Sequence, residues 1–313
     1  MTVDIILISY NQEQFIAQAV ESVLIQHVND DVQVRVIVAD DCSKDSTLEI
    51  VKSYEDRSPF PFVYLSPDTN LGISKNYQRA FAACDGDYIA ILEGDDWWSS
   101  PNHIEQHIRF LCTHKECSMS MNTITLFTQE TQESKSPYWG YGDSDVFYVN
   151  TEYQITQGNQ LGNLSACVCC NSCIKQLPDS LFGIPIADWM LGVMLSQQGA
   201  IALLKESTSV YRTNANSTWA SLSKKQQLKR MLELSKQYDK YQNGLYHIYW
   251  KKFRRKLINR NKRYLMPPLL YKFLKILARF VKTNRLCQQT NNRHIPAASS
   301  IGGVYPLSPT DLG

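Results

Sequence analysis

The sequence has no long hydrophobic run, although 43% of its 313 residues are hydrophobic. A helix that spans a bilayer needs roughly 20 consecutive apolar residues, and no uninterrupted stretch approaches that length. The N-terminus also lacks the basic segment and the cleavage site of a signal peptide. We therefore expect a protein that is made and kept in the cytoplasm.

The cysteines do not form an obvious disulfide framework. There are nine, an odd number, and most of them fall within apolar stretches. This usage is typical of free thiols in a reducing compartment. The cysteines between Cys167 and Cys173 have neither the spacing of a closed zinc site nor a histidine nearby. We interpret them as structural, with metal or redox chemistry as the less favoured alternative.

The signature motifs of several enzyme classes are missing. No Gly-x-Gly-x-x-Gly opens a helix after a strand, which disfavours a dinucleotide-dependent oxidoreductase. A Walker-type Gly-Lys-Ser/Thr is absent, and the six histidines do not have the spacing of a zinc hydrolase. The glycine- and lysine-rich phosphate loop of a sugar-nucleotide-forming nucleotidyltransferase is missing near the N-terminus.

Charge is distributed unevenly along the chain. Residues 1–219 contain 12 Lys and Arg against 27 Asp and Glu, a net charge of −15. Residues 220–313 contain 20 Lys and Arg against 3 Asp and Glu, a net charge of +17. The basic part suits an anionic membrane surface. We expect no nucleic-acid partner, because no recognition motif accompanies the charge.

Strands and helices alternate in the N-terminal half. Short apolar runs predict strands at Val3–Ile8, Val34–Ala39, Phe62–Leu65 and Tyr88–Leu92. Helices are expected between them, with Asn11 and Ser46 as caps of the first two and Ser74–Ala83 as the third. This order predicts an α/β fold with a Rossmann-like, mainly parallel central sheet flanked by helices. In such sheets the ligand binds beyond the carboxyl ends of the strands.

The second half of the sequence is less regular. We expect strands at Met119–Thr128 and Leu164–Cys170, and a strand pair at Ala200–Leu204 and Ser207–Tyr211. A helix is expected at 189–195.

The strongest chemical signal is the acidic run Glu93-Gly94-Asp95-Asp96, which follows an apolar strand. Adjacent carboxylates repel one another unless a positive charge lies between them, and a hard divalent cation with oxygen ligands is the usual answer. An acidic turn on an exposed loop is the alternative. The paired Trp97 and Trp98 favour a shaped pocket.

Two further clusters follow strands. Asp40 and Asp41 come directly after the second predicted strand, where a carboxylate can accept hydrogen bonds from a base or a ribose. A glycine turn at Gly72 opens a helix whose first turn carries Lys75, and helix N-termini bind phosphates. Taken singly, each cluster could equally be an ordinary turn or a surface lysine.

Together the clusters resemble the family-2 glycosyltransferases with the GT-A fold. The matching segments are Ile6–Asn11, Ala19–Gln26, Asp40–Asp45, Asn70–Ser74, Glu93–Trp98, Ile186–Trp189 and Val210–Arg212. The resemblance covers about residues 3–215 and is highly specific in the N-terminal half. The family's processive members carry a Gln-x-x-Arg-Trp motif and several membrane spans. Both are absent here, so we expect one sugar to be transferred per encounter.

The resemblance implies roles for individual residues. Nucleotide-sugar binding is assigned to Ser9, Tyr10, Asn11, Asp40, Lys75, Glu93 and Asp95. Asp95 and Asp96 are the implied ligands of Mn²⁺ or Mg²⁺. Asp188 matches the catalytic base, and Ala187 stands where relatives often have another acid.

These roles imply an inverting transfer of a sugar from a nucleotide-diphosphate sugar, with a UDP-sugar as the expected donor. The acceptor would be a saccharide or a lipid-linked saccharide, as in the synthesis of lipopolysaccharide, capsule or exopolysaccharide. A catalytically inactive relative that only binds nucleotide sugars is the alternative. Asp188 could also serve simply as the cap of its helix.

The basic C-terminal part is expected to be a separate extension. We divide the chain into a catalytic domain at 1–218, a basic amphipathic helical extension at 219–285 and a disordered tail at 286–313. Tyr246, Trp250, Phe253 and Leu257 fall on one side of a helix rich in Lys and Arg, and residues 269–282 repeat the pattern. Basic amphipathic helices with aromatics are typical of interfacial membrane anchors. We therefore expect a peripheral protein at the inner face of the cell membrane, with packing of these helices on the catalytic domain as the alternative.

Overall fold

The computed structural model describes residues 1–137, 139–159, 163–185, 188–214, 219 and 221–265. The chain divides into two compact units, Met1–Arg260 and Asn261–Gly313. The first unit contains the sheet and all the residues discussed below. In the second, the described element is α10 (Lys262–Leu265).

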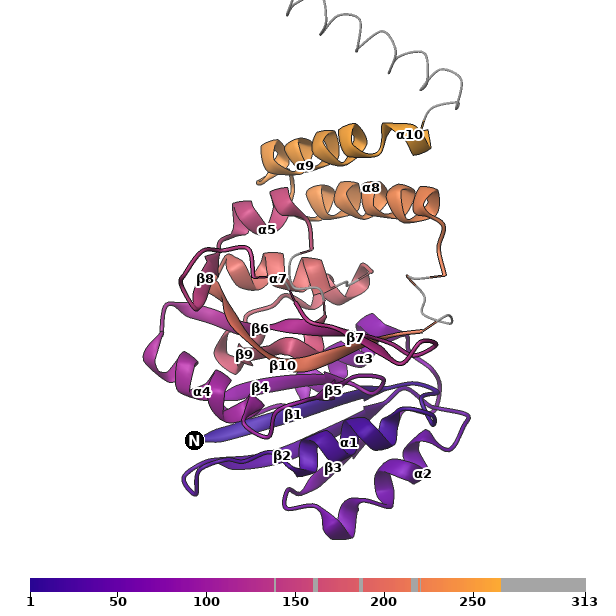
Figure 1. Cartoon of the computed structure of the whole chain (residues 1–313), viewed down its shortest axis with the longest axis vertical. Helices are drawn as coiled ribbons and strands as arrows, with labels where there is room; N and C mark the ends of the chain where they lie inside the picture. Colours follow the sequence, from indigo (N-terminus) through magenta and orange to yellow (C-terminus); the bar gives the residue numbers. More distant parts are fainter. Residues whose placement is uncertain (138, 160–162, 186–187, 215–218, 220, 266–313) are drawn as a thin grey trace, which may run out of the picture. The chain divides into compact units, whose positions relative to one another are not determined.

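The elements of the first unit are shown in Figure 1. The strands are β1 (Thr2–Ser9), β2 (Gln33–Asp40), β3 (Phe62–Leu65), β4 (Tyr88–Glu93), β5 (Trp97–Trp98), β6 (Cys117–Thr128), β7 (Glu133–Lys135), β8 (Val146–Val149), β9 (Cys167–Cys170) and β10 (Ala200–Thr213). The α-helices are α1 (Ile16–Leu24), α2 (Thr47–Lys52), α3 (Ile73–Ala82), α4 (His103–Thr113), α5 (Thr151–Gln157), α6 (Asn171–Ile174), α7 (Asp188–Ser196), α8 (Lys224–Tyr241) and α9 (His247–Arg260). Short 3-10 helices lie at Glu55–Arg57, Leu164–Ala166 and Asp179–Gly183.

One sheet with strand order β3-β2-β1-β4-β9-β6-β10-β5 organises this unit. The first four strands in this order run parallel, as the alternating pattern predicts. Their register places Ser9 beside Asp40 and Ile8 beside Glu93. The polar residues at three strand ends therefore meet at one edge of the sheet, as expected for this fold class.

The sheet becomes mixed in its second half, where β9 pairs antiparallel with both β4 and β6. The predicted strand pair at 200–211 is wrong, because these residues form the single long strand β10. Its register with β6 shifts between Leu204 and Ser209, so the polar residues Lys205 and Glu206 lie in an irregularity within one strand rather than in a turn. The expected α/β fold class is confirmed.

Helices cover both faces of the sheet. Alternate residues of each central strand point to opposite faces. In β1, Ile6 and Ile8 join a core with α3 and α7, whereas Ile5 and Leu7 join a second core with α1 and α4. The result is a three-layer α/β arrangement.

The helix caps differ from the sequence prediction. Asn11 does not cap α1, which begins after Phe15. Its backbone adopts a positive φ of 50°, and its side chain accepts a hydrogen bond from the Lys44 N–H at 2.8 Å. Ser46 stands at the N-cap of α2, but its side chain makes no capping hydrogen bond.

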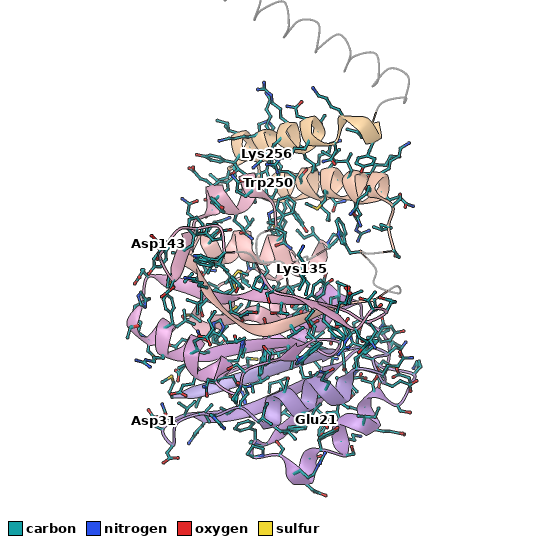
Figure 2. The ribbon with its side chains drawn as sticks, viewed as in Figure 1. Glu21, Asp31, Lys135, Asp143, Trp250 and Lys256 are labelled. Carbon is teal, nitrogen blue, oxygen red and sulfur yellow. The ribbon has the colours of Figure 1, made fainter. Side chains whose placement is uncertain are left out.

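Helices α8 and α9 lie side by side and belong to the first unit (Figure 1). Trp250 is fully buried, and Figure 2 labels it on α9. Its ring centroid lies 5.1 Å from that of Trp189 on α7, and Phe253 lies 4.7 Å from the same ring. The boundary expected at residue 218 therefore does not separate two units.

This packing corrects the membrane prediction for α9. The aromatic side chains expected to face lipid are instead turned toward the core, because Trp189 offers them an apolar surface in the same chain. The packing alternative is the one observed here. Residues 269–282 and the tail at 286–313 lie outside the described residues. Among the helices that the structure describes, none has the length and hydrophobicity to cross a membrane.

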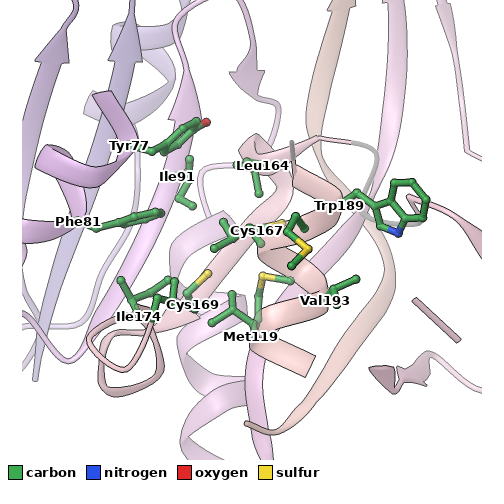
Figure 3. Close-up of a cluster of buried hydrophobic side chains, with 14 of the residues drawn as sticks. Tyr77, Phe81, Ile91, Met119, Leu164, Cys167, Cys169, Ile174, Trp189 and Val193 are labelled. Carbon is green, nitrogen blue, oxygen red and sulfur yellow. The ribbon is translucent and has the colours of Figure 1, made fainter. Parts of the chain in front are cut away.

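The cysteines between β4 and β6 pack as hydrophobic residues. Cys167 and Cys169 on β9 are fully buried beside Met119, Ile91 and Leu164 (Figure 3). The eight described cysteines are all free thiols, as predicted, and Cys287 lies outside the described residues. Burial raises the pKa of the Cys170 thiol to about 11, so it stays protonated and unreactive at neutral pH.

Candidate active site

A cleft of about 1020 Å³ opens at the carboxyl edge of the parallel strands. It is lined by the ends of β1 and β4, the start of α3, the loop after α5, the start of α7, and one side of α8 and α9. Seven of its lining residues are charged: Asp41, Glu93, Asp95, Asp188, Arg230, Lys256 and Arg260. The cleft is therefore shared between the acidic and basic parts of the sequence.

Glu93 and Asp95 reach the cleft from the end of β4. The turn between them is closely packed, because a Cβ on Gly94 would lie 2.4 Å from Gln12 Oε1 and 2.7 Å from Ile16 Cδ1, so both side chains would have to move. The Tyr77 hydroxyl donates to Glu93 at 2.9 Å. Burial, reinforced by the neighbouring carboxylates, raises the pKa of Glu93 well above its usual range.

Asp96 does not reach the cleft, contrary to the expectation that it would hold a metal. Its side chain is fully buried and accepts hydrogen bonds from Asn163 Nδ2 at 2.5 Å, Ser165 Oγ at 2.7 Å and the Arg212 N–H at 2.9 Å. These three donors tie two separate segments, the 3-10 helix at Leu164–Ala166 with its cap and the end of β10, to the acidic turn. Asp96 is thus held inside the scaffold, whereas Asp95 lines the cleft.

Arg212, which closes β10, supports the same turn from the other side. Its Nε donates to the Asp95 carbonyl oxygen at 2.7 Å. The guanidinium lies over the rings of Trp97, Phe15 and Phe127, at 4.6, 4.8 and 5.3 Å from their centroids. The arginine is thus locked into the scaffold by hydrogen bonds and cation–π contacts rather than directed into the cleft.

Asp188 begins α7 and lines the cleft across from the acidic turn. Asn159, in the loop after α5, donates from Nδ2 to Asp188 Oδ2 at 3.1 Å. Burial raises the pKa of Asp188, and the hydrogen bond from Asn159 opposes that rise. The charge of Asp188 also acts on Glu93, so the two carboxylates share one electrostatic environment.

The residues expected around the nucleotide base divide into two groups. Ser9 and Tyr10 line the cleft, and Tyr10 is 45% exposed. Asp40 is buried and does not line it, because Ser9 Oγ and the Ser43 N–H hold its carboxylate at 3.0 and 2.9 Å. Asp41 lines the cleft in its place.

Asp41 also shapes the loop before α3. Its two carboxylate oxygens accept hydrogen bonds from the Leu71 and Gly72 N–H groups, each at 2.9 Å. Asn11 and Lys75 are not among the residues that line the cleft. Lys75 is exposed and donates to Gln78 at 2.9 Å, and its contact with the nucleotide stays a prediction.

The comparisons with known proteins address the same segments. The sequence model described as glycosyl transferase family 2 matches residues 4–177, which is more than half of the chain. This chain belongs to glycosyl transferase family 2. The match includes the acidic turn and ends before Asp188.

Curated relatives of this glycosyltransferase are distant. An uncharacterised protein of Mycobacterium tuberculosis is 29% identical over 221 residues, which are 69% of this chain and 60% of that protein. The chain thus spans less than two thirds of this relative's length. A putative teichuronic acid biosynthesis glycosyltransferase of Bacillus subtilis, TuaG, is 31% identical over 41% of this chain and 48% of its own.

Solved structures of similar fold confirm the GT-A architecture. TarS of S. aureus in complex with UDP-GlcNAc aligns with a TM-score of 0.56 and 17% identity, over 76% of this chain and 65% of that one. The mannosyltransferase PcManGT of Pyrobaculum calidifontis, in complex with GDP-Man and Mn²⁺, aligns with a TM-score of 0.57 and 10% identity, over 88% and 79%. At these identities the likeness shows the fold alone.

Sequence reasoning missed several residues of the glycosyltransferase cleft. Asn159 follows α5, a short helix whose sequence has no strong hydrophobic periodicity and therefore did not predict it. Arg230, Lys256 and Arg260 come from helices that looked like a separate extension because of their charge. The spacing of these residues predicts which of them share one side of a helix. It does not predict that this side faces the cleft.

The acidic turn fits a divalent cation of the kind expected. Among the described residues, no group of three or more His, Cys, Asp or Glu side chains closes a metal site. Mg²⁺ commonly takes only one or two protein carboxylates and completes its shell with phosphate oxygens and water. Asp95 suits that arrangement, because it faces the cleft and burial raises its pKa, so its ionised form requires a positive partner.

Proposed function

We propose that this chain transfers a sugar from a nucleotide-diphosphate sugar to an acceptor hydroxyl, with inversion at the anomeric carbon. The observation that supports it is the meeting of Asp95 and Asp188 in one cleft, from two elements far apart in sequence. Asp95 suits the phosphate side of the reaction, and Asp188 suits the hydroxyl side.

The donor would lie along the ends of β1, β2 and β4. Tyr10, exposed at the rim, offers a face on which a base can stack, and the turn at Asp40 and Asp41 borders the same end of the cleft. Asp40 would act by fixing this turn through Ser9 and Ser43. We propose a UDP-sugar as the donor, in keeping with the UDP-GlcNAc complex of TarS.

Asp95 would hold Mn²⁺ or Mg²⁺ together with the donor's phosphate oxygens. Such an ion supplies positive charge that offsets the charge developing on the leaving diphosphate. Asp96 and Arg212 would keep the turn that carries Asp95 in place. PcManGT, which shares the fold, was crystallised with Mn²⁺.

Asp188 would act as the general base. A carboxylate on the face opposite the leaving diphosphate can remove the proton of the acceptor hydroxyl as the new bond forms, and a single displacement inverts the anomeric centre. Burial raises the pKa of Asp188, which makes its carboxylate a better base. Asn159 would hold the carboxylate in position.

The pathway we propose is the assembly of a cell-surface polysaccharide. Two relatives carry names of that kind: the putative teichuronic acid biosynthesis glycosyltransferase TuaG and the abequosyltransferase RfbV of Salmonella typhimurium, which is 24% identical over 31% of this chain. The acceptor would then be a saccharide or a lipid-linked saccharide.

We also propose a cytoplasmic enzyme that binds peripherally to an anionic membrane, through a surface other than the one expected from the sequence. Leu245 and Ile248, at the turn into α9, are 74% and 76% exposed. Lys251, Lys252 and Arg255 are exposed on the same helix. Exposed aliphatic side chains beside basic residues suit a lipid surface.

The direct test of the proposed activity is a screen of nucleotide sugars for hydrolysis and transfer, with Mn²⁺ or Mg²⁺ and with excess chelator. We expect one UDP-sugar to be turned over only when the metal is present. Binding of a nucleotide sugar without any turnover, in the presence of a range of saccharide acceptors, would instead support an inactive relative.

A further inference from the structure

One wall of the cleft is basic and belongs to the C-terminal helices. Lys256 and Arg260 are one turn apart on α9, and Arg230 lies on the cleft side of α8. Figure 2 labels Lys256 on α9. The apolar residues of the same wall are Trp219, Met231, Leu234, Phe253 and Leu257.

No described side chain neutralises the positive charge of this wall. Among the described residues, no carboxylate lies within ion-pair distance of Arg230, Lys256 or Arg260. Arg254, on the same helix but away from the cleft, does pair with Asp239 at 2.8 Å. Crowded like charges without a partner are unfavourable, and an anion bound among them would relieve the repulsion.

The basic wall adjoins Asp188, the proposed catalytic base. It does not adjoin Ser9 and Tyr10, where we expect the nucleotide to bind. Lys256 Nζ donates to Gln157 at the end of α5. Two residues further on, Asn159 donates to Asp188 at 3.1 Å. One short stretch of chain therefore connects the wall to Asp188, whereas Ser9, Tyr10 and the donor's expected place lie at the strand ends.

We infer that the wall formed by α8 and α9 is the acceptor subsite, and that it takes an acceptor with a phosphate or diphosphate group next to an apolar chain. Arg230, Lys256 and Arg260 bind the phosphate, and the apolar side chains between them contact the chain. This inference rests on the proposed function, because it assigns the acceptor of the same reaction. It gives the basic C-terminal helices a part in substrate selection.

The carboxylates of the cleft favour binding of the acceptor's phosphate at the basic wall. Glu93, Asp95 and Asp188 repel an anion unless a cation is present, and the expected cation is used by the donor diphosphate. The wall is the part of the cleft where an anionic group meets guanidinium and ammonium donors directly. Hydrogen bonds between charged partners are the stronger class and also fix orientation.

The test uses farnesyl diphosphate as a probe, measured by calorimetry with the full chain while saturating UDP and Mg²⁺ fill the donor site. Lys256→Gln with Arg260→Gln should weaken the binding of farnesyl diphosphate about tenfold or more, since each substitution removes a charge-assisted contact. The affinity for UDP should not change. Lys225→Gln with Lys229→Gln, which alters exposed charges of α8 outside the cleft, is the matched control and should bind the probe as wild type does.

Each alternative result is decisive. Unchanged binding of farnesyl diphosphate by the Lys256→Gln, Arg260→Gln variant would overturn the inference, as would a loss of UDP affinity in that variant, which would assign the wall to the donor. Farnesol and inorganic diphosphate each carry one half of the probe. If inorganic diphosphate bound as tightly as farnesyl diphosphate, the proposed contact with an apolar chain would be wrong. Failure of the wild type to bind UDP would count against the proposed function itself, whereas UDP binding without probe binding would count only against this subsite.

Discussion

Asp95 and Asp96 are neighbours in sequence, yet the fold gives them different environments. Asp96 is fully buried and held by three donors from two segments, while Asp95 faces the cleft. The sequence predicts an acidic motif but cannot say which carboxylate points inward. That choice depends on Asn163 and Ser165, which lie about seventy residues away in the chain and are brought together by the pairing of β9 with β4.

This difference leads to a prediction about stability. Asp96→Ala leaves the buried donors of Asn163, Ser165 and Arg212 without an acceptor, and each unpaired buried donor costs about 1–3 kcal/mol. We expect the free energy of unfolding in urea to fall by several kcal/mol. Asp95→Ala should change it by less than about 1 kcal/mol, because that side chain faces the cleft. Equal losses in the two variants would contradict the assignment.

Asn159 is the residue that the structure adds to the proposed mechanism. The hydrogen bond from Asn159 lowers the pKa of Asp188, against the rise caused by burial. Asn159→Ala should therefore raise the pKa of Asp188 further. The base is active when deprotonated, so the acid limb of kcat/KM should move to higher pH, and kcat at neutral pH should fall roughly tenfold.

The measurement is the pH profile of sugar transfer by wild type and by Asn159→Ala. Asn163→Ala is unsuitable as a control because Asn163 holds Asp96. Gln157→Ala, at the end of the helix that precedes this loop and bound to Lys256, is the better one and should leave the acid limb in place. An unshifted acid limb in Asn159→Ala would show that Asn159 does not position the base.

At the scale of elements, the N-terminal βα units were predictable and the later ones were not. β1, β2 and β4 are buried apolar runs with polar ends, whereas β3 is an apolar run that is only partly buried. Each of the four strands appears within two residues of its expected bounds. β10 was divided in the prediction because Lys205 and Glu206 look like a turn. A register shift against β6 accommodates them, and such a shift depends on the partner strand.

Helix α9 is amphipathic as predicted, but its apolar face packs against the protein core and not against lipid. Tyr246, Trp250, Phe253 and Leu257 do form one face, and it packs on the core. A hydrophobic face does not reveal whether lipid or protein covers it. Here Trp189 of α7 covers this face, because its ring contacts Trp250 and Phe253. Nothing in the sequence indicates that α7 lies close to α9.

The exposed turn before α9 gives a separate prediction about membranes. Leu245→Ser with Ile248→Ser removes the two most exposed large apolar side chains among the described residues. Binding to vesicles rich in anionic lipid should weaken roughly tenfold at low salt, because less apolar area is buried at the interface. Co-sedimentation measures it, with Ile25→Ser on the opposite part of the unit as a control for lost exposed apolar area. Unchanged binding by the double variant would remove this turn from the membrane proposal.

At the scale of the whole molecule, the acidic and basic parts of the chain meet in one cleft of the first unit. Acidic residues from the βα units and basic residues from α8 and α9 line the same cavity. Composition along the chain revealed the two signs of charge. It could not reveal that residues 219–260 fold back onto residues 1–214, since that contact rests on side-chain packing between distant segments.

The central claim is that Asp188 is the base of an inverting sugar transfer. Other carboxylates suit this role poorly, because Asp143 is exposed outside the cleft (Figure 2), Asp145 pairs with Lys205 at 3.1 Å and Glu152 accepts from Tyr249. Asp188→Asn keeps the size and the cap position of the side chain but cannot take a proton.

The most direct measurement is therefore single-turnover transfer by Asp188→Asn from the UDP-sugar identified in the screen, alongside calorimetric binding of UDP with Mg²⁺. Asp143→Asn serves as the control for a lost carboxylate. We predict unchanged UDP affinity and a transfer rate lower by roughly 10²–10⁴, the contribution typical of a positioned proton-transfer group. Transfer by Asp188→Asn at nearly the wild-type rate, with UDP bound normally, would contradict the account.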